Sequence, residues 1–298
     1  WGIRNSSPDS RPEYAQELLS SGVIDVASCN WFFAALKDDG SVILMPADYA
    51  DYYGDRGSLR SGVSKIYPLG MGSSLNSLTN APAQPQFAAL KTNGSVVCFG
   101  SNSSRVNYLN SQISELSGVS EICSNLTVFA ALKTDGSVFT WGGDGTGAYG
   151  EDVSSVSSQL SSGVRKVFSN VTSFAALKYN GSVITWGSAN GTNTGGDSSS
   201  VASELSSGVT EIFSTDFAYA ALKNDGSVVT WGSANYGGNS SSVASQLSSG
   251  VTKIYAGTIA FAALKDDGSV VTWGLGSSAG DSSSVASELS SGVIEIYS

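Results

Sequence analysis

The stretch Ala220-Ala221-Leu222-Lys223-Asn224-Asp225-Gly226-Ser227-Val228-Val229-Thr230-Trp231-Gly232 decides the fold. Its Asp225-Gly226 pair lies between two apolar-rich segments and predicts a two-residue type I′ turn. In that turn both central residues take a positive φ, which Asp followed by Gly tolerates. The segments on either side are therefore predicted to be adjacent antiparallel strands.

Three signatures recur along the chain in fixed order. A Ser-Gly-Val strand start occurs seven times, at Gly22, Gly62, Gly118, Gly163, Gly208, Gly250 and Gly292. An aromatic-Ala-Ala-Leu-Lys strand with an Asx-Gly turn follows six of them, from Phe33, Phe87, Phe129, Phe174, Tyr219 and Phe261. Third strands end at Trp141, Trp186, Trp231 and Trp273, each followed by Gly, with Phe99-Gly100, Met45-Pro46 and Trp1-Gly2 as further copies.

The first strands and the connectors carry their own patterns. Alternation predicts Val251, Lys253 and Tyr255 on one face of a first strand, with Thr252 and Ile254 on the other. Between Trp-Gly and the next Ser-Gly-Val, the segment 200–208 has apolar residues spaced four apart, with Ser before and Gly after. This spacing predicts a short capped helical turn in place of a fourth strand.

The repeat of about 42–45 residues predicts an all-β fold, a seven-bladed β-propeller formed as a single domain over residues 1–298. Each blade would have three main strands plus the short helical or fourth-strand segment. Both strand faces are apolar, and Ala pairs lie opposite large aromatics, which suits sheets stacked face to face. The repeated Trp is therefore predicted to pack into the neighbouring blade and not to form a ligand platform.

The seventh blade is incomplete in this sequence, because Gly292–Ser298 supplies its first strand and Trp1-Gly2 the end of its third. Two explanations are open: a flanking sequence of a longer chain completes the blade, or the blade is left open. The first is favoured, because an exposed two-strand edge invites pairing with other chains.

The formal charge of −10 and the pI near 4.4 disfavour a nucleic-acid or anionic-membrane partner. No apolar run of membrane-spanning length occurs, so no membrane insertion is expected. The start at Trp1, without an initiator Met or a signal peptide, indicates a processed or excised segment. The acidic, Ser- and Gly-rich composition favours an extracellular or cell-surface location. Cys29, Cys98 and Cys123 are expected to be small buried side chains; pairing of Cys98 with Cys123 is the alternative.

The chemistry of the sequence is sparse. Histidine is absent, which excludes Ser-His-Asp triads, Cys-His dyads and His-bearing metal sites. The pairs Asp38-Asp39 and Asp266-Asp267 lie at predicted turns, where the first residue is solvated and the second serves turn geometry. We therefore expect no enzyme activity, no catalytic residue, no cofactor and no metal. A calcium site of oxygen ligands in the acidic stretch Asp48–Arg56 is the less favoured alternative.

Two irregular segments form the candidate partner-binding face. One loop carries Tyr49, Tyr52, Tyr53 and Arg56, and the insertion between Pro68 and Gln86 carries Met71 and Asn76. Loops that project from a rigid scaffold commonly bind partners, and tyrosines suit protein interfaces. Neutral drift of an early blade explains the insertion equally well. The second hypothesis is a glycan-binding module that uses the loop aromatics Tyr149 and Tyr236.

The order of these signatures resembles the repeat of the regulator of chromosome condensation family. The resemblance rests on Ile212-Phe213-Ser214 and the stretch Ala220–Gly232, and it extends over essentially the whole chain. It implies a seven-bladed propeller, whereas members of that family serve several unrelated functions. The family's Gly-Gln-Leu-Gly loop after Trp-Gly is replaced here by segments such as 233–238, so no exchange-factor residue is carried over. We expect a non-enzymatic protein-binding or adhesion scaffold, one module of a larger extracellular or assembly protein, with a glycan-binding propeller as the alternative.

Overall fold

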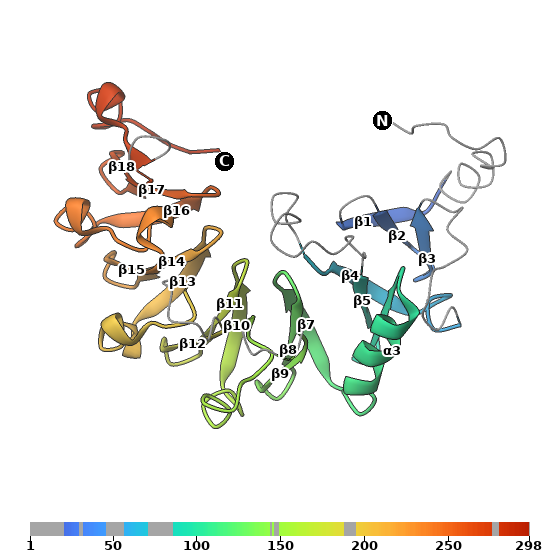
Figure 1. The fold of residues 1–298 in the computed structure, drawn as a ribbon. Coiled ribbons are helices and arrows are strands. Elements are labelled where there is room, and N and C mark those ends of the chain that lie inside the picture. Colours follow the sequence, from blue (N-terminus) through green and yellow to red (C-terminus); the bar gives the residue numbers. More distant parts are fainter. Residues whose placement is uncertain are drawn as a thin grey trace. The chain divides into compact units, whose positions relative to one another are not determined.

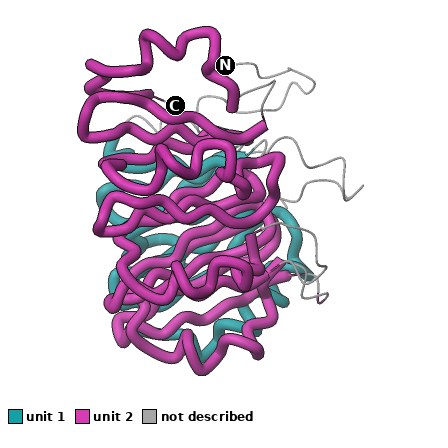
Figure 2. The backbone as a smooth tube through the Cα atoms, turned by 90° about the vertical axis from the view of Figure 1, so that its left-hand side faces the viewer, with its two compact units in different colours: residues 1–122 teal, residues 123–298 magenta. Residues whose placement is uncertain are grey.

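The computed structural model describes residues 21–29, 32–45, 57–70, 86–143, 145, 149–187, 195–275 and 280–297. The chain divides into two compact units, Trp1–Ile122 and Cys123–Ser298, which Figure 2 draws in different colours. Each unit is described by itself.

The described residues form six three-stranded sheets, each with its strands in chain order (Figure 1). The first strands are β1 (Val23–Cys29), β4 (Val63–Pro68), β7 (Val119–Ser124), β10 (Val164–Ser169), β13 (Val209–Ser214) and β16 (Val251–Ala256). The second strands are β2 (Phe32–Lys37), β5 (Gln86–Lys91), β8 (Val128–Lys133), β11 (Ser173–Lys178), β14 (Ala218–Lys223) and β17 (Ala260–Lys265). The third strands are β3 (Val42–Met45), β6 (Val96–Gly100), β9 (Val138–Gly142), β12 (Val183–Gly187), β15 (Val228–Gly232) and β18 (Val270–Gly274). These antiparallel meanders are the predicted propeller blades; the count of seven and the single domain stay predictions.

Strict alternation in the first strands is wrong. The pairing of β16 with β17 shifts register between Val251 and Lys253, which leaves Thr252 as an extra residue. Val251 and Ile254 therefore share the buried face, and Thr252 and Lys253 are both exposed. The Thr252 hydroxyl donates to the Leu264 carbonyl at 3.1 Å across this bulge.

The antiparallel hairpins are confirmed, but the two-residue turn is wrong. In the β14–β15 hairpin, Gly226 N–H donates to the Lys223 carbonyl at 3.0 Å, and Lys223 N–H donates to the Ser227 carbonyl at 2.9 Å. This is the three-residue turn with a bulged Gly, and not the type I′ turn. Its cause lies in the side chain before the Gly, because Asp225 Oδ1 accepts the N–H of Ser227 at 2.9 Å and so takes the bond that a two-residue turn would use.

Each turn Gly also joins its sheet to the next one. The Gly226 carbonyl accepts Val251 N–H at 3.0 Å, at the start of the following first strand. Gly226 has φ +76°, and a Cβ there would lie 2.8 Å from the nitrogen of Gly250. Glycine is required at this position for its positive φ and for the close approach of the two backbones.

The short helical connectors are confirmed. They are the 3-10 turns η1 (Ser199–Val201), η2 (Glu204–Ser206), η4 (Ser241–Val243) and η6 (Ser283–Val285), with η3 (Ala234–Tyr236) in the loop before η4. One connector is instead the helix α3 (Ser103–Gln112), whose N-cap Asn102 accepts Arg105 N–H at 2.8 Å. The Ser cap predicted for these turns makes no side-chain cap bond. Asp197 takes that place, because its Oδ1 accepts Ser199 N–H at 2.8 Å.

The core lies between sheets that stack in chain order within each unit. In unit 2, Trp273 and Phe261 pack against Ala218, Ala220 and Leu222 of the preceding sheet. Trp273 is 2% exposed and stacks on Phe261 with ring centroids 5.2 Å apart. Trp141, Trp186 and Trp231 are buried in the same way, which confirms the structural role predicted for them.

Candidate functional site

The predicted binding residues fall on segments that the structure does not describe. Tyr49, Tyr52, Tyr53, Arg56, Met71 and Asn76 all lie outside the described residues, as do Asp48 and the proposed calcium ligands around it. The two ends of the insertion are described. Leu69 N–H donates to the Gln86 carbonyl at 2.9 Å, so the insertion begins and ends on the firm pairing of β4 with β5.

The second carboxylate of each Asp pair serves its turn, as predicted. Asp267 Oδ1 accepts the hydroxyl of Ser269 at 2.6 Å and its N–H at 2.9 Å. These bonds from Ser269 hold the pKa of Asp267 below its usual value, and Ser41 does the same for Asp39. Among the described residues, no cluster of three or more His, Cys, Asp or Glu side chains could hold a metal ion.

The loop aromatics of the glycan hypothesis pack against their own unit. Tyr236 lies edge-on to Phe217 with ring centroids 4.7 Å apart, and Tyr149 packs against the core around Trp186. None of the three cysteines forms a disulfide with another described residue, so Cys98 and Cys123 do not pair. Cys29 and Cys98 are buried as predicted, and Cys123 is half-buried.

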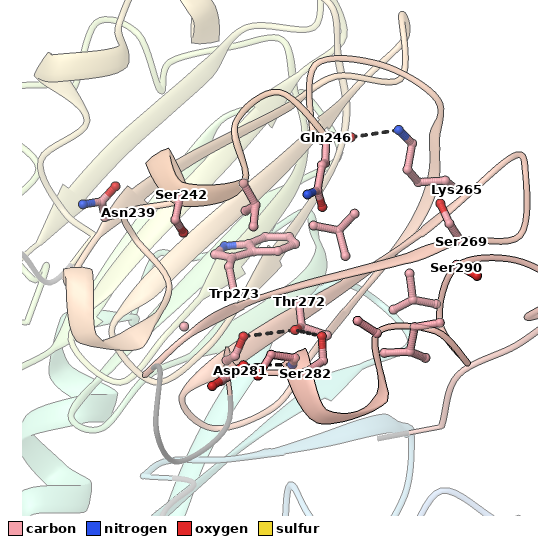
Figure 3. Close-up of a pocket in the computed structure, with 18 residues that line it drawn as sticks. Asn239, Ser242, Gln246, Lys265, Ser269, Thr272, Trp273, Asp281, Ser282 and Ser290 are labelled. Atoms are coloured by element: carbon pink, nitrogen blue, oxygen red, sulfur yellow. Dashed lines mark hydrogen bonds between the residues drawn. The ribbon is translucent and has the colours of Figure 1, made fainter.

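Unit 2 has an open groove of about 700 Å³ on its last sheet, along β18 (Figure 3). Figure 3 shows Trp273 with Asn239 and Gln246 on one side, from the preceding connector, and Asp281 and Ser282 on the other. The groove is an open surface lined by both polar and apolar side chains, and it is not a closed cavity.

The polar groups of the groove already have structural partners. Lys265 Nζ donates to the Gln246 carbonyl at 2.9 Å, and the Thr272 hydroxyl donates to the Gly280 carbonyl at 3.0 Å. Asp281 accepts Ser283 N–H at 2.9 Å, which lowers the pKa of its carboxyl. Among the described residues that line the groove, no acidic side chain forms an ion pair with Lys265.

A second surface comes from the first strands of unit 2, which lie side by side in chain order. The third residue of each first-strand segment is exposed, and its charge alternates in sign. We call these residues the charged row: Lys166, Glu211, Lys253 and Glu295. In unit 1 the equivalent residues also alternate, as Asp25, Lys65 and Glu121.

The charges of the row act on one another. The Tyr255 phenol raises the pKa of Lys253 most, and the charges of Glu295 and Glu211 raise it further. Lys253 Nζ lies 4.7 Å from the Tyr255 ring centroid, and Lys166 Nζ lies 4.8 Å from that of Phe168. Each lysine of the row thus rests over an aromatic ring two residues later.

The charged row was missed from the sequence, although its signal is present there. Two residues beyond each Ser-Gly-Val the charge changes sign from one copy to the next. A comparison of the copies position by position, instead of an apolar pattern read along each copy, would have found it.

No family model and no curated protein matches this sequence. Solved structures are similar at low identity. The ectodomain of the receptor kinase CR4 from Physcomitrella patens is 16% identical, with 84% of this chain and 62% of that chain covered and a TM-score of 0.45. This chain therefore spans less than two thirds of that ectodomain.

Two further structures are similar over most of the chain. The ectodomain of the receptor kinase ACR4 from Arabidopsis thaliana is 15% identical, with 85% of this chain and 80% of that chain covered and a TM-score of 0.43. Yeast RCC1 (Prp20), solved with Kap60, is 15% identical, with 85% of this chain and 70% of that chain covered and a TM-score of 0.43. None of these similarities assigns an activity, a partner or a compartment to this chain. Among the described residues, no helix is long and apolar enough to span a membrane.

Proposed function

We propose that this chain is a non-enzymatic protein-binding or adhesion scaffold and one module of a larger extracellular or assembly protein. The observation that carries the proposal is the charged row. Its four exposed side chains present two positive and two negative charges in a fixed order along successive first-strand segments. Charges of both signs in fixed order favour a protein partner with the complementary order over a polyanion.

The aromatic rings beneath the lysines add to this surface. Tyr255 and Phe168 are half-buried and hold the lysine stems against the strand. Aromatic side chains next to ordered charges are typical of protein interfaces. The loops with Tyr49, Tyr52, Tyr53, Arg56, Met71 and Asn76 belong to the proposal as a second contact region in unit 1.

The test exchanges two charges within the row. The double variant Glu211→Lys, Lys253→Glu keeps the net charge and composition but changes the order from alternating to paired. Proteins retained by the immobilised native chain at physiological ionic strength should be lost from this variant. The control variant Thr210→Ser, Thr252→Ser alters neighbouring residues of the same strands and should retain them.

Equal retention by the native chain and the exchanged variant would rule out the charged row as the binding surface. Turnover of a reporter substrate by the purified chain would contradict the non-enzymatic part of the proposal.

A further inference from the structure

The segment Gly292–Tyr297 repeats the pattern of a first strand. Val293-Ile294-Glu295-Ile296-Tyr297 has the same order of residue types as Val209–Phe213: Val, a variable residue, a charge, Ile and an aromatic. Its start is held as in the other sheets, because Val293 N–H donates to the Gly268 carbonyl at 3.0 Å. Glu295 also takes its place beside Lys253 in the charged row.

This segment has no strand beside it in the part of the chain that the structure describes. Tyr297 is 86% exposed, whereas its equivalent Tyr255 is half-buried in the preceding sheet. The Tyr297 hydroxyl donates only to its neighbour Glu295, at 2.8 Å. A positioned extended segment without a neighbour presents backbone donors and acceptors that another strand can bind.

The repeat shows what kind of strand belongs there. In every sheet the first strand pairs with an aromatic-Ala-Ala-Leu-Lys strand, and all six such strands of the sequence are already paired with their own first strands. A second copy of the segment is disfavoured, because antiparallel self-pairing centred on Glu295 would place two carboxylates opposite each other.

We infer that residues 293–297 form a docking edge for a β-hairpin of the aromatic-Ala-Ala-Leu-Lys type, supplied by a polypeptide from outside residues 1–298. The inference concerns a second surface and holds whether or not the charged row binds a partner.

The register of the docked strand follows from the preceding sheet. There Val251 pairs with Lys265, Lys253 with Leu264, Ile254 with Ala263 and Tyr255 with Ala262. By the same register, Val293 meets the Lys of the hairpin, Glu295 its Leu, and Ile296 and Tyr297 its two Ala residues.

Two groups of unit 2 outside the segment would also contact the docked hairpin: a connector carbonyl and a leucine side chain. In the sheets before, the Lys at the end of the second strand bonds a connector carbonyl: Lys223 Nζ to Glu204 at 2.8 Å and Lys265 Nζ to Gln246 at 2.9 Å. The equivalent carbonyl for the docked Lys is that of Glu288. Leu247 of the preceding connector is buried against Phe261 and Ala263, whereas its equivalent, Leu289, is half-buried and lines the groove of Figure 3. The aromatic residue of the hairpin would cover Leu289.

The probe is a synthetic peptide with the sequence of residues 217–232, which contains a complete hairpin of this chain. Fluorescence anisotropy of the labelled peptide should show saturable binding to the unaltered chain of residues 1–298. A peptide with Ala221→Lys should bind at least tenfold more weakly, because this Ala is fully buried in its own sheet.

Two matched protein variants locate the site. Ile296→Lys should weaken binding at least tenfold, because the equivalent Ile254 is buried in a completed sheet. Ile294→Lys should bind normally, because the equivalent Thr252 is exposed in a completed sheet. Equal thermal midpoints of the two variants show that the fold is kept.

If Ile296→Lys does not fold, amide exchange on the native chain decides. The amides of residues 293–297 should be protected when the peptide is present. Absence of saturable binding to the native chain would overturn the inference, and so would an equal loss in Ile294→Lys or unchanged exchange at these amides. The Glu211→Lys, Lys253→Glu variant should still bind the peptide, which separates this result from that of the charged row.

Discussion

The sheet β13–β14–β15 and the segment Gly292–Tyr297 share one sequence pattern in two surroundings. Both begin with a Val whose N–H is bound by the turn Gly of the preceding sheet, at 3.0 Å in each. Ile212 and Phe213 of the complete sheet are buried and half-buried, whereas their equivalents Ile296 and Tyr297 are half-buried and 86% exposed. The repeat therefore positions the start of a first strand, but burial and pairing require the hairpin beside it.

The largest expected difference between these regions lies in their Ile side chains. Ile212→Ala should destabilise unit 2 by about 3 kcal/mol, because it leaves a cavity between stacked sheets. Ile296→Ala should lower the stability of unit 2 by less than about 1 kcal/mol, because no described strand pairs with this segment and its side chain therefore loses fewer contacts. Urea midpoints followed by tryptophan fluorescence measure both, and equal costs would contradict the comparison.

The glycines should differ next. Gly226→Ala combines a positive φ with a Cβ 2.8 Å from the Gly250 nitrogen, and should cost about 2–3 kcal/mol. Gly292 has a similar φ of +78°, but a Cβ there would meet no atom within 4 Å. Gly292→Ala should therefore cost only about 1 kcal/mol, the conformational part alone. Thermal midpoints of the two variants, with Gly257→Ala as the near-neutral control, test this order.

A smaller effect separates turns that contain Asp from turns that contain Asn. The bonds from Ser227 lower the pKa of Asp225 in the folded chain. The ionised Asp225 carboxylate therefore stabilises the fold fully above its unfolded pKa near ~3.9, and this stabilisation is lost as the pH falls through the lower folded pKa. In Asp225→Asn this acid-dependent part should vanish, as it is absent from the Asn180 turn, which has the same bond to Ser182 at 3.0 Å. Amide exchange at Ser227, followed from about pH 7 to about pH 2, measures it. A variant that keeps the acid-dependent loss would refute this assignment.

The smallest effect belongs to the charged row. The pKa of Lys253 is raised in the folded chain. The contribution of its charge to stability is therefore present below the unfolded pKa near ~10.4 and is lost as the pH rises through the folded pKa. Lys253→Gln should lower the thermal midpoint slightly at low salt and not at high salt, because exposed charges are screened. Thr252→Gln on the same strand should show no salt dependence. A salt-independent loss in Lys253→Gln would assign its role to packing on Tyr255.

The strands and hairpins could be predicted from the sequence because their signals are local. Asx-Gly pairs, apolar runs and the repeated Trp all act within one sheet or between neighbours, and the structure confirms each of these elements. The turn type could not be predicted, because it depends on whether the Asx side chain or the backbone accepts the next N–H. Asp225 shows that the side chain accepts it. The bulge at Thr252 could not be predicted either, because it is a feature of the pairing of β16 with β17 and not of one strand alone.

The candidate site was harder to predict. The irregular loops were predicted to bind a partner because they break the repeat. The sequence of Tyr49–Arg56 and of the insertion after Leu69 has no regular pattern, so it predicts no geometry for a site. The charged row obeys the repeat in position and departs from it only in the sign of the charge. A comparison of the copies position by position reveals this alternation, but only the structure shows that the strands that carry it lie side by side.

The hydrogen bond of each turn glycine carbonyl always connects its sheet to the sheet that follows in the sequence. The Gly226 carbonyl accepts the N–H of Val251, and the Gly268 carbonyl accepts that of Val293, so each is left to water until the following first strand folds. A sheet made first during synthesis therefore remains unfinished until its C-terminal neighbour folds against it, so unit 2 should grow from its N-terminal side by successive additions. Damage to one turn glycine would then be felt mainly in the sheet that follows, and far less in the sheet that precedes it.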